Sequence, residues 1–477
     1  MKSAKQIFSN KVTRNAIFFT VFILFIYRIG ANIVTPGVNN SIYSGASIDS
    51  LTSGVSTLFD FFGGGSLSQM GLFALGVSPY ISASVMIQLL ESDLVPAMSE
   101  WKHQGVDGET KRSKWTKILT IILAFVQGLG ILIGSYISSG YAIVSDPSVL
   151  GYLEVTILLT AGCAIVVWLA DRITELGVGN GLSVIITAGI LSQVPVQITS
   201  IRSMFTSYFT EGSIPSFMSD PAGWFNGMWT TIKGNVDLQH DIYLWGAILI
   251  LFIVLVIVII YYTLAERRIP INYVRGQNTS VKKNSYLPIK LNPAGVIPII
   301  FVQPFLIIVG IVLGYAFNNI PFFNGNGHGQ IEQFLLALTG NFPTSDSPYY
   351  LGFSIAYIVM YGFLIIGFTM IYSSIQMNPE EMTKNLANQQ AYIVNTRPGD
   401  DTFEYLNNTL KRTSLWGGII LFIIAVIPVV LNQFLQVNVN LSLIGTGLII
   451  NVGVIVQVYQ SLLNRSEKQK YRAIVGE

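Results

Sequence analysis

The residue types that most often carry catalysis or bind metals are few and far apart in this chain. The only cysteine, Cys163, lies in an apolar run, so no disulfide can form within the chain. The three histidines, His103, His240 and His328, lack the short spacing of metal ligands. A Walker loop, which would bind a nucleotide phosphate, is not recognisable either. The sequence therefore predicts no catalytic, metal or cofactor site, and no enzyme.

The composition indicates a protein that is embedded in a membrane. Hydrophobic residues make up 51% of the 477 residues, charged residues only 11%, and the mean hydropathy is +0.56. These values lie outside the range of soluble globular proteins. The net charge of +2 is too small to predict a nucleic-acid partner, so the placement of the charges matters more than their sum.

Apolar runs long enough to cross a bilayer, which takes about 20 residues, recur along the chain. The first run is not followed by a small-residue cleavage site, which favours a retained span over a signal peptide. Ten transmembrane helices are predicted, near residues 15–34, 72–91, 116–137, 152–170, 183–201, 243–264, 294–316, 350–375, 413–431 and 441–463.

Lysine and arginine are concentrated on one side of these ten spans. The two tails and the loops after even-numbered spans carry most of them, including six between residues 266 and 290. The loops after spans 1, 3, 7 and 9 have none. The positive-inside rule therefore predicts that both termini lie in the cytoplasm.

Residues 56–92 depart from the pattern of one uninterrupted apolar helix per span. The first apolar piece ends at Gly63, Gly64 and Gly65 and is too short to cross a membrane. The second piece is long enough but contains Pro79 and several serines. Broken backbone at membrane depth is tolerated only where protein or trapped water satisfies its polar groups. This stretch by itself predicts, with equal weight, the lining of a cavity or an external loop that leads into a span.

A second interrupted span suggests an internal repeat. Five spans, a connection over about 203–242 and five more spans suggest two halves in inverted orientation. Span 7 contains Pro293, Pro298 and Pro304 and matches the interrupted span 2 in position. Such a pair of interrupted segments points to a central pathway, which favours the cavity over the external loop.

Few charges lie within the predicted spans. An ion-coupled transporter usually needs a buried acid or base. Here Arg28 and Glu154 fall near external ends, whereas Asp171 and Arg172 fall near a cytoplasmic end. The carbonyl filters and charged rings of ion channels are not recognisable. The small and apolar side chains predict a passage that does not select its cargo by charge.

Five blocks of sequence carry a resemblance to a known family. They are LFALGVSPYISASVMIQLL (72–90), WLADRITELGVGNGLSVIITAGI (168–190), ERRIPINYV (266–274), YLPIKLNPAGVIPIIF (286–301) and MNPEEMTKNLANQQAYIVNTRPGDDTFEYLN (377–407). In this order, and over nearly the whole chain, they resemble the SecY family, the pore subunits of the bacterial general protein translocase. The length and the full loops are similar to the housekeeping form rather than to accessory forms. The resemblance implies a channel through which unfolded secretory polypeptides cross the membrane and from which hydrophobic segments move sideways into lipid.

The resemblance assigns residues 58–70 to the plug, a short re-entrant helix that closes the external side of the pore. Each glycine weakens a helix by about 1 kcal/mol relative to alanine. Three consecutive glycines therefore predict a segment that is marginally held and displaceable. The plug residues are Leu58, Phe59, Phe61, Phe62, Gly63, Gly64, Gly65 and Leu67.

An apolar pore ring and a polar lateral gate are also implied by the resemblance. Two pairs of ring residues are spaced by four positions, which places each pair on one helical face. The competing interpretation is ordinary packing in the core or against lipid. Asn451 departs from the apolar residue that is usual beside the ring. The ring residues are Val77, Ile81, Leu182, Ile186, Ile300 and Ile450, and the gate residues are Ser82, Gln127 and Asn292.

Two large loops, 266–290 and 377–412, correspond to the family's docking surface for the SecA motor ATPase and for ribosomes. Arg267, Arg268 and Arg397 are the implied docking residues. Arginine suits this role because its planar, permanently charged side chain pairs with carboxylates or phosphates. The alternative is that these charges only set the topology. Further implied partners are SecE-like and SecG-like small membrane subunits, polypeptides with signal sequences, and lipid.

The sequence thus predicts an all-α polytopic membrane protein with ten transmembrane helices in two inverted five-helix halves and a short plug helix. Residues 1–202 form the N-terminal half, 203–242 an external hinge loop, 243–463 the C-terminal half and 464–477 a cytoplasmic tail. The expected location is the bacterial cytoplasmic membrane. The alternative function is that of a ten-span secondary transporter with inverted repeats.

Overall fold

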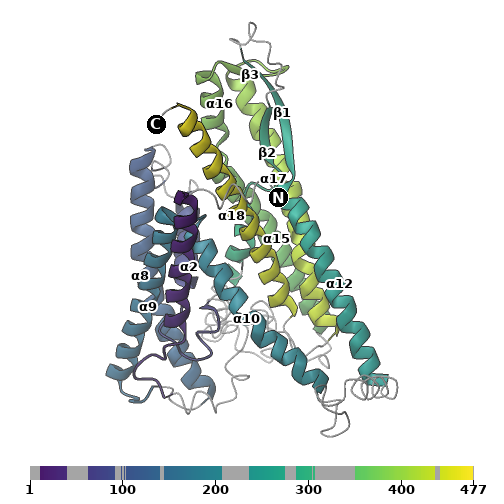
Figure 1. Ribbon diagram of the computed structural model, residues 1–477. Coiled ribbons are helices and arrows are strands. Elements are labelled where there is room, and N and C mark those ends of the chain that lie inside the picture. Colours follow the sequence, from purple (N-terminus) through teal and green to yellow (C-terminus); the bar gives the residue numbers. More distant parts are fainter. Residues whose placement is uncertain are drawn as a thin grey trace, which may run out of the picture.

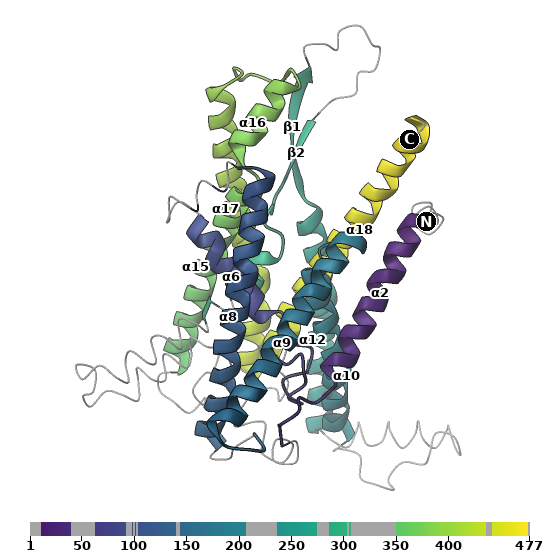
Figure 2. The same ribbon diagram turned by 90° about the vertical axis from the view of Figure 1, so that its left-hand side faces the viewer.

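The computed structural model consists almost entirely of helices, with one small sheet at one end of the molecule (Figure 1). We call this end the sheet end. The first described helix begins, and the last one ends, toward the sheet end (Figures 1 and 2). The structure describes residues 11–39, 63–91, 98, 101, 104–139, 144–206, 236–273, 286–302, 305, 306, 350–435 and 441–475.

Seven helices in these residues are long and apolar enough to cross a membrane, which makes the chain a multi-pass membrane protein. The helices are α2 (Lys11–Ala31), α6 (Ser78–Leu89), α8 (Val106–Ser139), α9 (Val149–Leu176), α10 (Gly181–Thr206), α12 (Val236–Leu264), α15 (Tyr350–Gln376), α16 (Pro379–Asn388), α17 (Asp400–Leu435) and α18 (Leu441–Val475). The strands are β1 (Glu266–Tyr273), β2 (Tyr286–Lys290) and β3 (Ala391–Ile393).

The helices pack as two neighbouring sets. α8 lies between α6 and α9, and α9 also contacts α2 and α10. In the second set α17 lies between α15 and α18, and α12 contacts α18. α2 and α10 of the first set contact α18, so α18 joins the two sets (Figures 1 and 2).

The second predicted span begins later than expected. α6 starts at Ser78 instead of near residue 72. Gly76 has a φ of +52°, which is incompatible with a right-handed helix. Pro79 lies in the first turn of α6, where its missing N–H leaves no helical bond unmade. Residues 64–77 are not helical. The short plug helix was predicted to extend to residue 70, and this end point is wrong.

Three helices extend beyond their predicted apolar runs toward the sheet end. α8 begins 10 residues early, α17 begins at Asp400 instead of residue 413, and α18 continues to Val475 through the predicted tail. The first turn of α17 contains Asp400 and Asp401, whose negative charge stabilises a helix N-terminus. Hydropathy marks only the part of a helix that lies in lipid, so it underestimates helices that continue into water.

Much of the seventh predicted span lies outside the described residues. Its described part becomes helical at Ile297, shortly after Pro293, and extends to Leu306. Residues 207–235, within the predicted hinge loop, also lie outside the described part of the chain. The total of ten spans and their arrangement in inverted halves therefore stay predictions.

The antiparallel sheet has the strand order β2-β1-β3 and unites two loops that are distant in sequence. Alternate residues of β1, Ile269 and Ile271, are buried, as expected for a strand with one face on a core. They belong to one hydrophobic cluster with Leu386 of α16 and with Leu406 and Leu410 of α17. The polar start of α17 is therefore part of a small folded unit and not a loose extension.

Glycines allow the non-helical segment 64–77 to pass close to two helices. A Cβ atom on Gly162 of α9 would overlap the carbonyl oxygen of Leu72. A Cβ atom on Gly71 would overlap the carbonyl oxygen of Ala31 at the end of α2. The segment is thus held between α2 and α9 at distances that only a residue without a side chain permits.

Replacing Gly162 with valine should strongly destabilise the protein, because the added side chain has no space beside the Leu72 carbonyl. Overpacking of this kind typically costs about 1–3 kcal/mol, and displaced backbone adds to it. The melting temperature of the purified protein in detergent measures the effect. Gly130→Val in α8 is the matched control, since nothing lies within 4 Å of a Cβ atom there. Equal melting temperatures for the two variants would contradict the tight packing.

Candidate functional site

The residues predicted as a pore ring lie together in the largest hydrophobic cluster of the described chain. Their elements are the start of α6, α10, the seventh predicted span and α18. Five of the six expose 4% or less of their surface, and Leu182 is partly buried against the same cluster. Their function as a ring stays a prediction. The six are Val77, Ile81, Leu182, Ile186, Ile300 and Ile450.

A cavity of about 590 Å³ adjoins this cluster. Ile81, Leu182, Ile186 and Ile300 form part of its lining. The remaining walls come from α6, α8, α9, α10, the seventh predicted span and α15. We call this cavity the vestibule. Four of the six predicted ring residues thus lie where an apolar cluster meets a cavity shared by both sets of helices.

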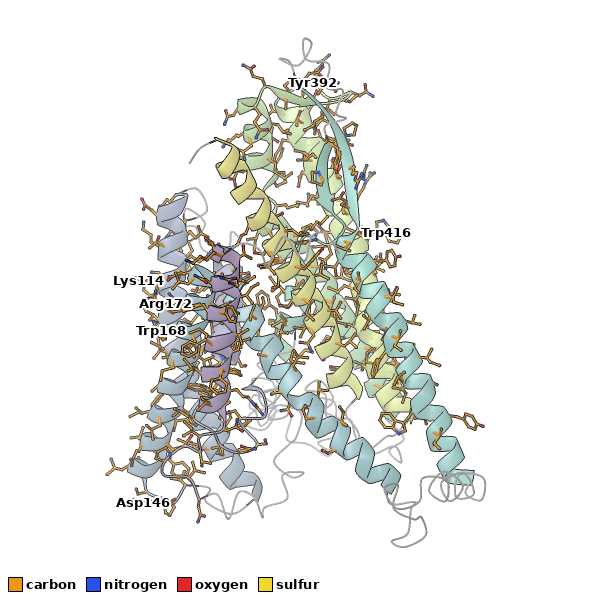
Figure 3. All side chains as sticks on the ribbon, in the orientation of Figure 1. Lys114, Asp146, Trp168, Arg172, Tyr392 and Trp416 are labelled. Carbon is orange, nitrogen blue, oxygen red and sulfur yellow. The ribbon has the colours of Figure 1, made fainter. Side chains whose placement is uncertain are left out.

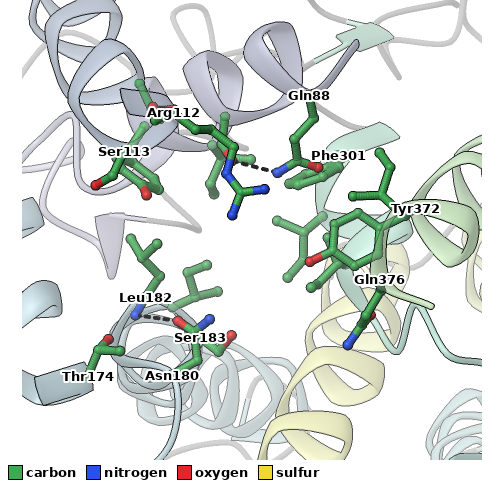
Figure 4. Close-up of a pocket in the computed structure, with 18 of the residues that line it drawn as sticks. Gln88, Arg112, Ser113, Thr174, Asn180, Leu182, Ser183, Phe301, Tyr372 and Gln376 are labelled. Carbon is green, nitrogen blue, oxygen red and sulfur yellow. Dashed lines mark hydrogen bonds between the residues drawn. The ribbon is translucent and has the colours of Figure 1, made fainter. Parts of the chain in front are cut away.

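The rest of the vestibule is mainly polar (Figure 4). Tyr372 and Gln376 of α15 lie across it from Leu182 of α10 and from Asn180, which directly precedes that helix. The Asn180 side chain accepts a hydrogen bond from the backbone N–H of Leu182 at 3.1 Å and so caps the start of α10. Gln88 bonds to Ser84 on the preceding turn of α6 at 2.9 Å. These amides and hydroxyls provide a wettable surface next to the aliphatic cluster.

Arg112 projects into the vestibule, although it was not among the residues predicted for the pathway (Figure 4). Its guanidinium lies 3.8 Å from Glu91, which is 3% exposed, and 3.5 Å from Glu109. Arg112 lies in α8, which begins ten residues before its predicted apolar run. The vestibule therefore has a charged side chain in its wall, and the passage without charge selection stays a prediction. The helical spacing from Arg112 to the vestibule residue Thr116 could have signalled its position.

Only part of the predicted plug lies within the described residues. Leu58, Phe59, Phe61 and Phe62 lie outside them. Gly63, Gly64 and Leu67 are buried, and Gly65 is partly buried. The carbonyls of Gly63 and Gly64 accept hydrogen bonds from side chains of α2 and α10. The three glycines are thus enclosed by protein.

Gly63, Gly64 and Gly65 were expected to weaken the plug helix, but the structure gives another reason for glycine at these positions. Gly64 and Gly65 have φ values of +71° and +81°, which residues with side chains rarely adopt. A Cβ atom on Gly64 would lie 3.0 Å from the Cα atom of Gly189 on α10. Glycine is therefore required by backbone conformation and close packing. The expectation that the triplet is loosely held because it weakens a helix is not supported for these residues.

The three predicted gate residues are not joined by hydrogen bonds. Ser82 donates to the carbonyl of Ser78 on its own helix at 3.2 Å. Asn292 donates to the carbonyl of Gly295 at 2.5 Å. The buried side-chain oxygens of Gln127 and Asn292 have no hydrogen-bond partner in the described structure. The positions are partly or fully buried, but the expected polar cluster does not form here.

The three predicted docking arginines differ in their surroundings, although all are exposed. Arg267 and Arg268 are consecutive in β1, so they point to opposite faces of the sheet. Arg268 bonds to Glu266 at 2.8 Å and lies over the Tyr286 ring at 4.7 Å, and the hydrogen bond with Glu266 raises its pKa. Arg397 has no ion pair among those described. Arg268 is thus the one of the three that is held in an ion pair among the described residues, and the docking role of all three stays a prediction.

Two residues singled out by type also have clear positions. Cys163 is fully buried in a hydrophobic cluster of α9, so it serves packing there. Asn451, next to Ile450, has a buried side-chain oxygen without a hydrogen-bond partner in the described structure. Among the described residues, no group of three or more His, Cys, Asp and Glu side chains is arranged to hold a metal ion.

The overall fold resembles that of known structures. The fold matches "The structure of a protein conducting channel" with a TM-score of 0.56 at 17% identity, covering 94% of this chain and 92% of that one. It matches Sec61 in a canine ribosome–channel complex with a TM-score of 0.54 at 17% identity and the same coverage. It also matches a structure concerned with the plug domain of SecY with a TM-score of 0.55 at 18% identity and the same coverage.

Sequence comparison identifies the family. The chain is 35% identical over 473 residues to "Protein translocase subunit SecY" of Staphylococcus carnosus (strain TM300), with 98% of each chain covered. It is 33% identical over 467 residues to "Protein translocase subunit SecY 1" of Lactobacillus kefiranofaciens subsp. kefiranofaciens, again with 98% of each covered. Residues 71–459 match the family profile SecY. The chain therefore belongs to the SecY family.

Proposed function

We propose that this chain forms the pore of a protein translocase in the cytoplasmic membrane of a bacterium. It passes unfolded secretory polypeptides across the membrane and releases hydrophobic segments sideways into lipid. The observation that carries this proposal is the junction between the aliphatic cluster, with Ile81, Ile186 and Ile300, and the polar vestibule. Membership of the SecY family supports it independently.

An aliphatic constriction seals a pore because it excludes hydrated ions. An ion that enters it loses its water shell and gains no replacement ligands, so the constriction dewets. Isoleucine side chains can rotate and move apart when a polypeptide segment passes, because no hydrogen bond or ion pair holds them. The amides of Gln88 and Asn180 keep the adjoining vestibule wet for the hydrophilic parts of that polypeptide.

The sheet end is the cytoplasmic end in this proposal. Lys114 and Arg172 lie toward the sheet end, whereas Asp146 lies at the opposite end (Figure 3). This distribution agrees with the positive-inside rule. Both termini then lie in the cytoplasm, the vestibule faces the cytoplasm, and the plug segment lies toward the outside.

The ten predicted spans form two inverted halves, 1–202 and 243–463, joined by the loop 203–242. The contact of α2 and α10 with α18 is then the line along which the halves meet. A side exit lies between α6 and α8 on one wall and the seventh span and α15 on the other. The lining of the vestibule supports this exit, since it draws residues from all four of these elements. Ser82, Gln127 and Asn292 are its proposed polar residues.

The sheet end is also the proposed docking surface for a SecA-type motor ATPase and for ribosomes. One similar fold is that of Sec61 in a canine ribosome–channel complex. The sheet joins both docking loops into one folded unit, so Arg267, Arg268 and Arg397 are presented on a stable support. SecE-like and SecG-like small subunits brace the two sets of helices, which contact each other mainly through α18.

Transport of a precursor tests the function directly. The chain is purified together with its small membrane subunits and placed in lipid vesicles with a SecA-type motor. A secretory precursor should become resistant to external protease only when ATP is present, and only if it carries a signal sequence. A ten-span secondary transporter predicts no such protection. Full digestion of the precursor under all conditions would overturn the proposal.

Serine at four ring positions should make resting vesicles leaky to ions. The change is made at Ile81, Ile186, Ile300 and Ile450 together, since hydroxyl groups would allow water into the constriction. Ion flux measured with a fluorescent indicator should rise at least about tenfold, while the protein still inserts normally.

The matched control for the ring places serine at four isoleucines of other helix surfaces, Ile122, Ile157, Ile253 and Ile455, which are all exposed.

In a Cys163→Ser background, single cysteines at the four ring positions should also crosslink to a precursor arrested in transit. A tight serine variant together with four unreactive cysteines would show that the ring is misplaced.

Reversing the charge of Arg397 should separate docking from membrane topology. Arg397→Glu removes one basic residue among many, too few to invert the protein, but it repels an acidic partner surface. Motor-driven translocation should fall about tenfold with normal insertion. Arg14→Glu in α2 is the control, with an equal change in charge away from the sheet. Wild-type stimulation of the motor's ATPase by the Arg397 variant would refute the docking role.

A further inference from the structure

The position of Arg28 is not explained by its effect on membrane topology. It lies in the last turn of α2, at the end of that helix away from the sheet end. Basic residues elsewhere gather toward the sheet end, so Arg28 opposes the positive-inside pattern. A cationic side chain within a membrane span is usually paired with an acid or a backbone carbonyl, so the partner of Arg28 near the end of its span indicates its function.

The partner of Arg28 is the backbone of the plug segment. Its guanidinium Nη1 donates to the carbonyl oxygen of Gly64 at 2.7 Å. The neighbouring Tyr27 donates its hydroxyl to the carbonyl oxygen of Gly63 at 3.2 Å. From α10, the Ser192 hydroxyl lies 2.9 Å from the same Gly64 carbonyl and 2.6 Å from the Gly189 carbonyl of its own helix, so its single proton is shared between these two acceptors. Two helices therefore bind two consecutive carbonyls of one short segment.

The surroundings hold these donors in position. Tyr27 is 1% exposed and its ring stacks on Phe73, with centroids 6.0 Å apart. Gly64 lies so close to α10 that a Cβ atom would be 3.0 Å from both the Gly189 Cα atom and the Ser192 Oγ atom. The turn at Gly63 and Gly64 is thus closely packed against α2 and α10.

The bond from Arg28 is the strongest of the three by its chemistry. A hydrogen bond from a charged donor is shorter and about twice as strong as one between neutral groups. The acceptor of this charged bond, the carbonyl of Gly64, belongs to a buried turn in which Gly64 has a φ of +71°.

We propose that Arg28 is a positioning residue which, together with Tyr27 and Ser192, anchors the plug segment, residues 58–70, at Gly63 and Gly64 and so sets how readily the closed channel opens. This inference rests on the proposed translocase function. Loss of the anchor lowers the free energy needed to displace the plug. The closed channel then leaks more, and a weaker signal sequence is enough to open it.

The variants for the test separate charge, hydrogen bonding and structure. Arg28→Gln removes the charge, Arg28→Lys keeps it with a single ammonium donor, and Ser192→Ala removes a neutral hydrogen bond on α10. Arg14→Gln, near the other end of α2, is the control for loss of one charge from that helix. All are made in the full chain with its small membrane subunits, in vesicles.

Two measurements are made on each variant. Resting ion flux should rise about tenfold for Arg28→Gln and about threefold for Ser192→Ala, in line with the loss of a charged and a neutral hydrogen bond. Arg28→Lys should fall between the wild type and Arg28→Gln. Motor-driven import of a precursor with a shortened hydrophobic signal should increase in the same order. A residue needed only for folding would lower protein yield and melting temperature without changing either readout.

The outcomes distinguish the anchor from the channel function. If the wild-type complex does not protect a normal precursor from protease, the proposed function fails. If the wild type does so, but Arg28→Gln and Ser192→Ala match Arg14→Gln in ion flux and in signal requirement, the anchor is refuted. Should Arg28→Gln not insert, Ser192→Ala decides, because it leaves every charge in place.

Discussion

Backbone amides and carbonyls within a bilayer find no water, so any break in a helix there needs partners from the protein itself. The non-helical segment 64–77 meets this constraint through its neighbours. Leu72 N–H donates to the Ile33 carbonyl at 2.7 Å, and Thr35 N–H donates to the Met70 carbonyl at 2.9 Å. Bonds this short between the segment and the end of α2 require backbones in close contact, which Gly71 permits. Residues 64–77 are therefore a packed, hydrogen-bonded part of the helix bundle.

The same segment determines where the candidate pore lies. Because it occupies the chain up to Val77, α6 has only 12 residues, and one face of this helix carries Val77, Ile81, Ser84 and Gln88 in succession. The first two belong to the aliphatic cluster and the last two line the vestibule. A single helical face thus changes from apolar to polar along its length. This change places the aliphatic cluster directly beside the polar wall of the vestibule.

The contacts between the two sets of helices are unequal. At the GVGNG turn, residues 177–181, Arg465 of α18 in the second set donates to the Gly177 carbonyl at 2.7 Å, while Val178 N–H donates to Thr20 of α2 within the first set. The three proposed gate residues, by contrast, do not bond to one another. A firm contact near α18 and the lack of hydrogen bonds among the proposed gate residues agree with the proposed side exit. Hydrogen bonds between side chains in lipid contribute only about 0.6 kcal/mol on average, so packing at the turn matters more than polar pairing at the gate.

The sequence by itself determined the class of protein, the approximate positions of most spans and the family. Apolar runs located α2, α9 and α12 well, because in lipid only a helix or a closed barrel satisfies the backbone and each helix does so within its own residues. The tertiary structure decided the late start of α6, the place of Arg112 in the vestibule and the binding of Gly64 by Arg28 and Ser192. Gly64 and Ser192 are 128 residues apart in sequence. Hydropathy is a local property, whereas such contacts depend on how distant helices pack, and no local pattern contains that information.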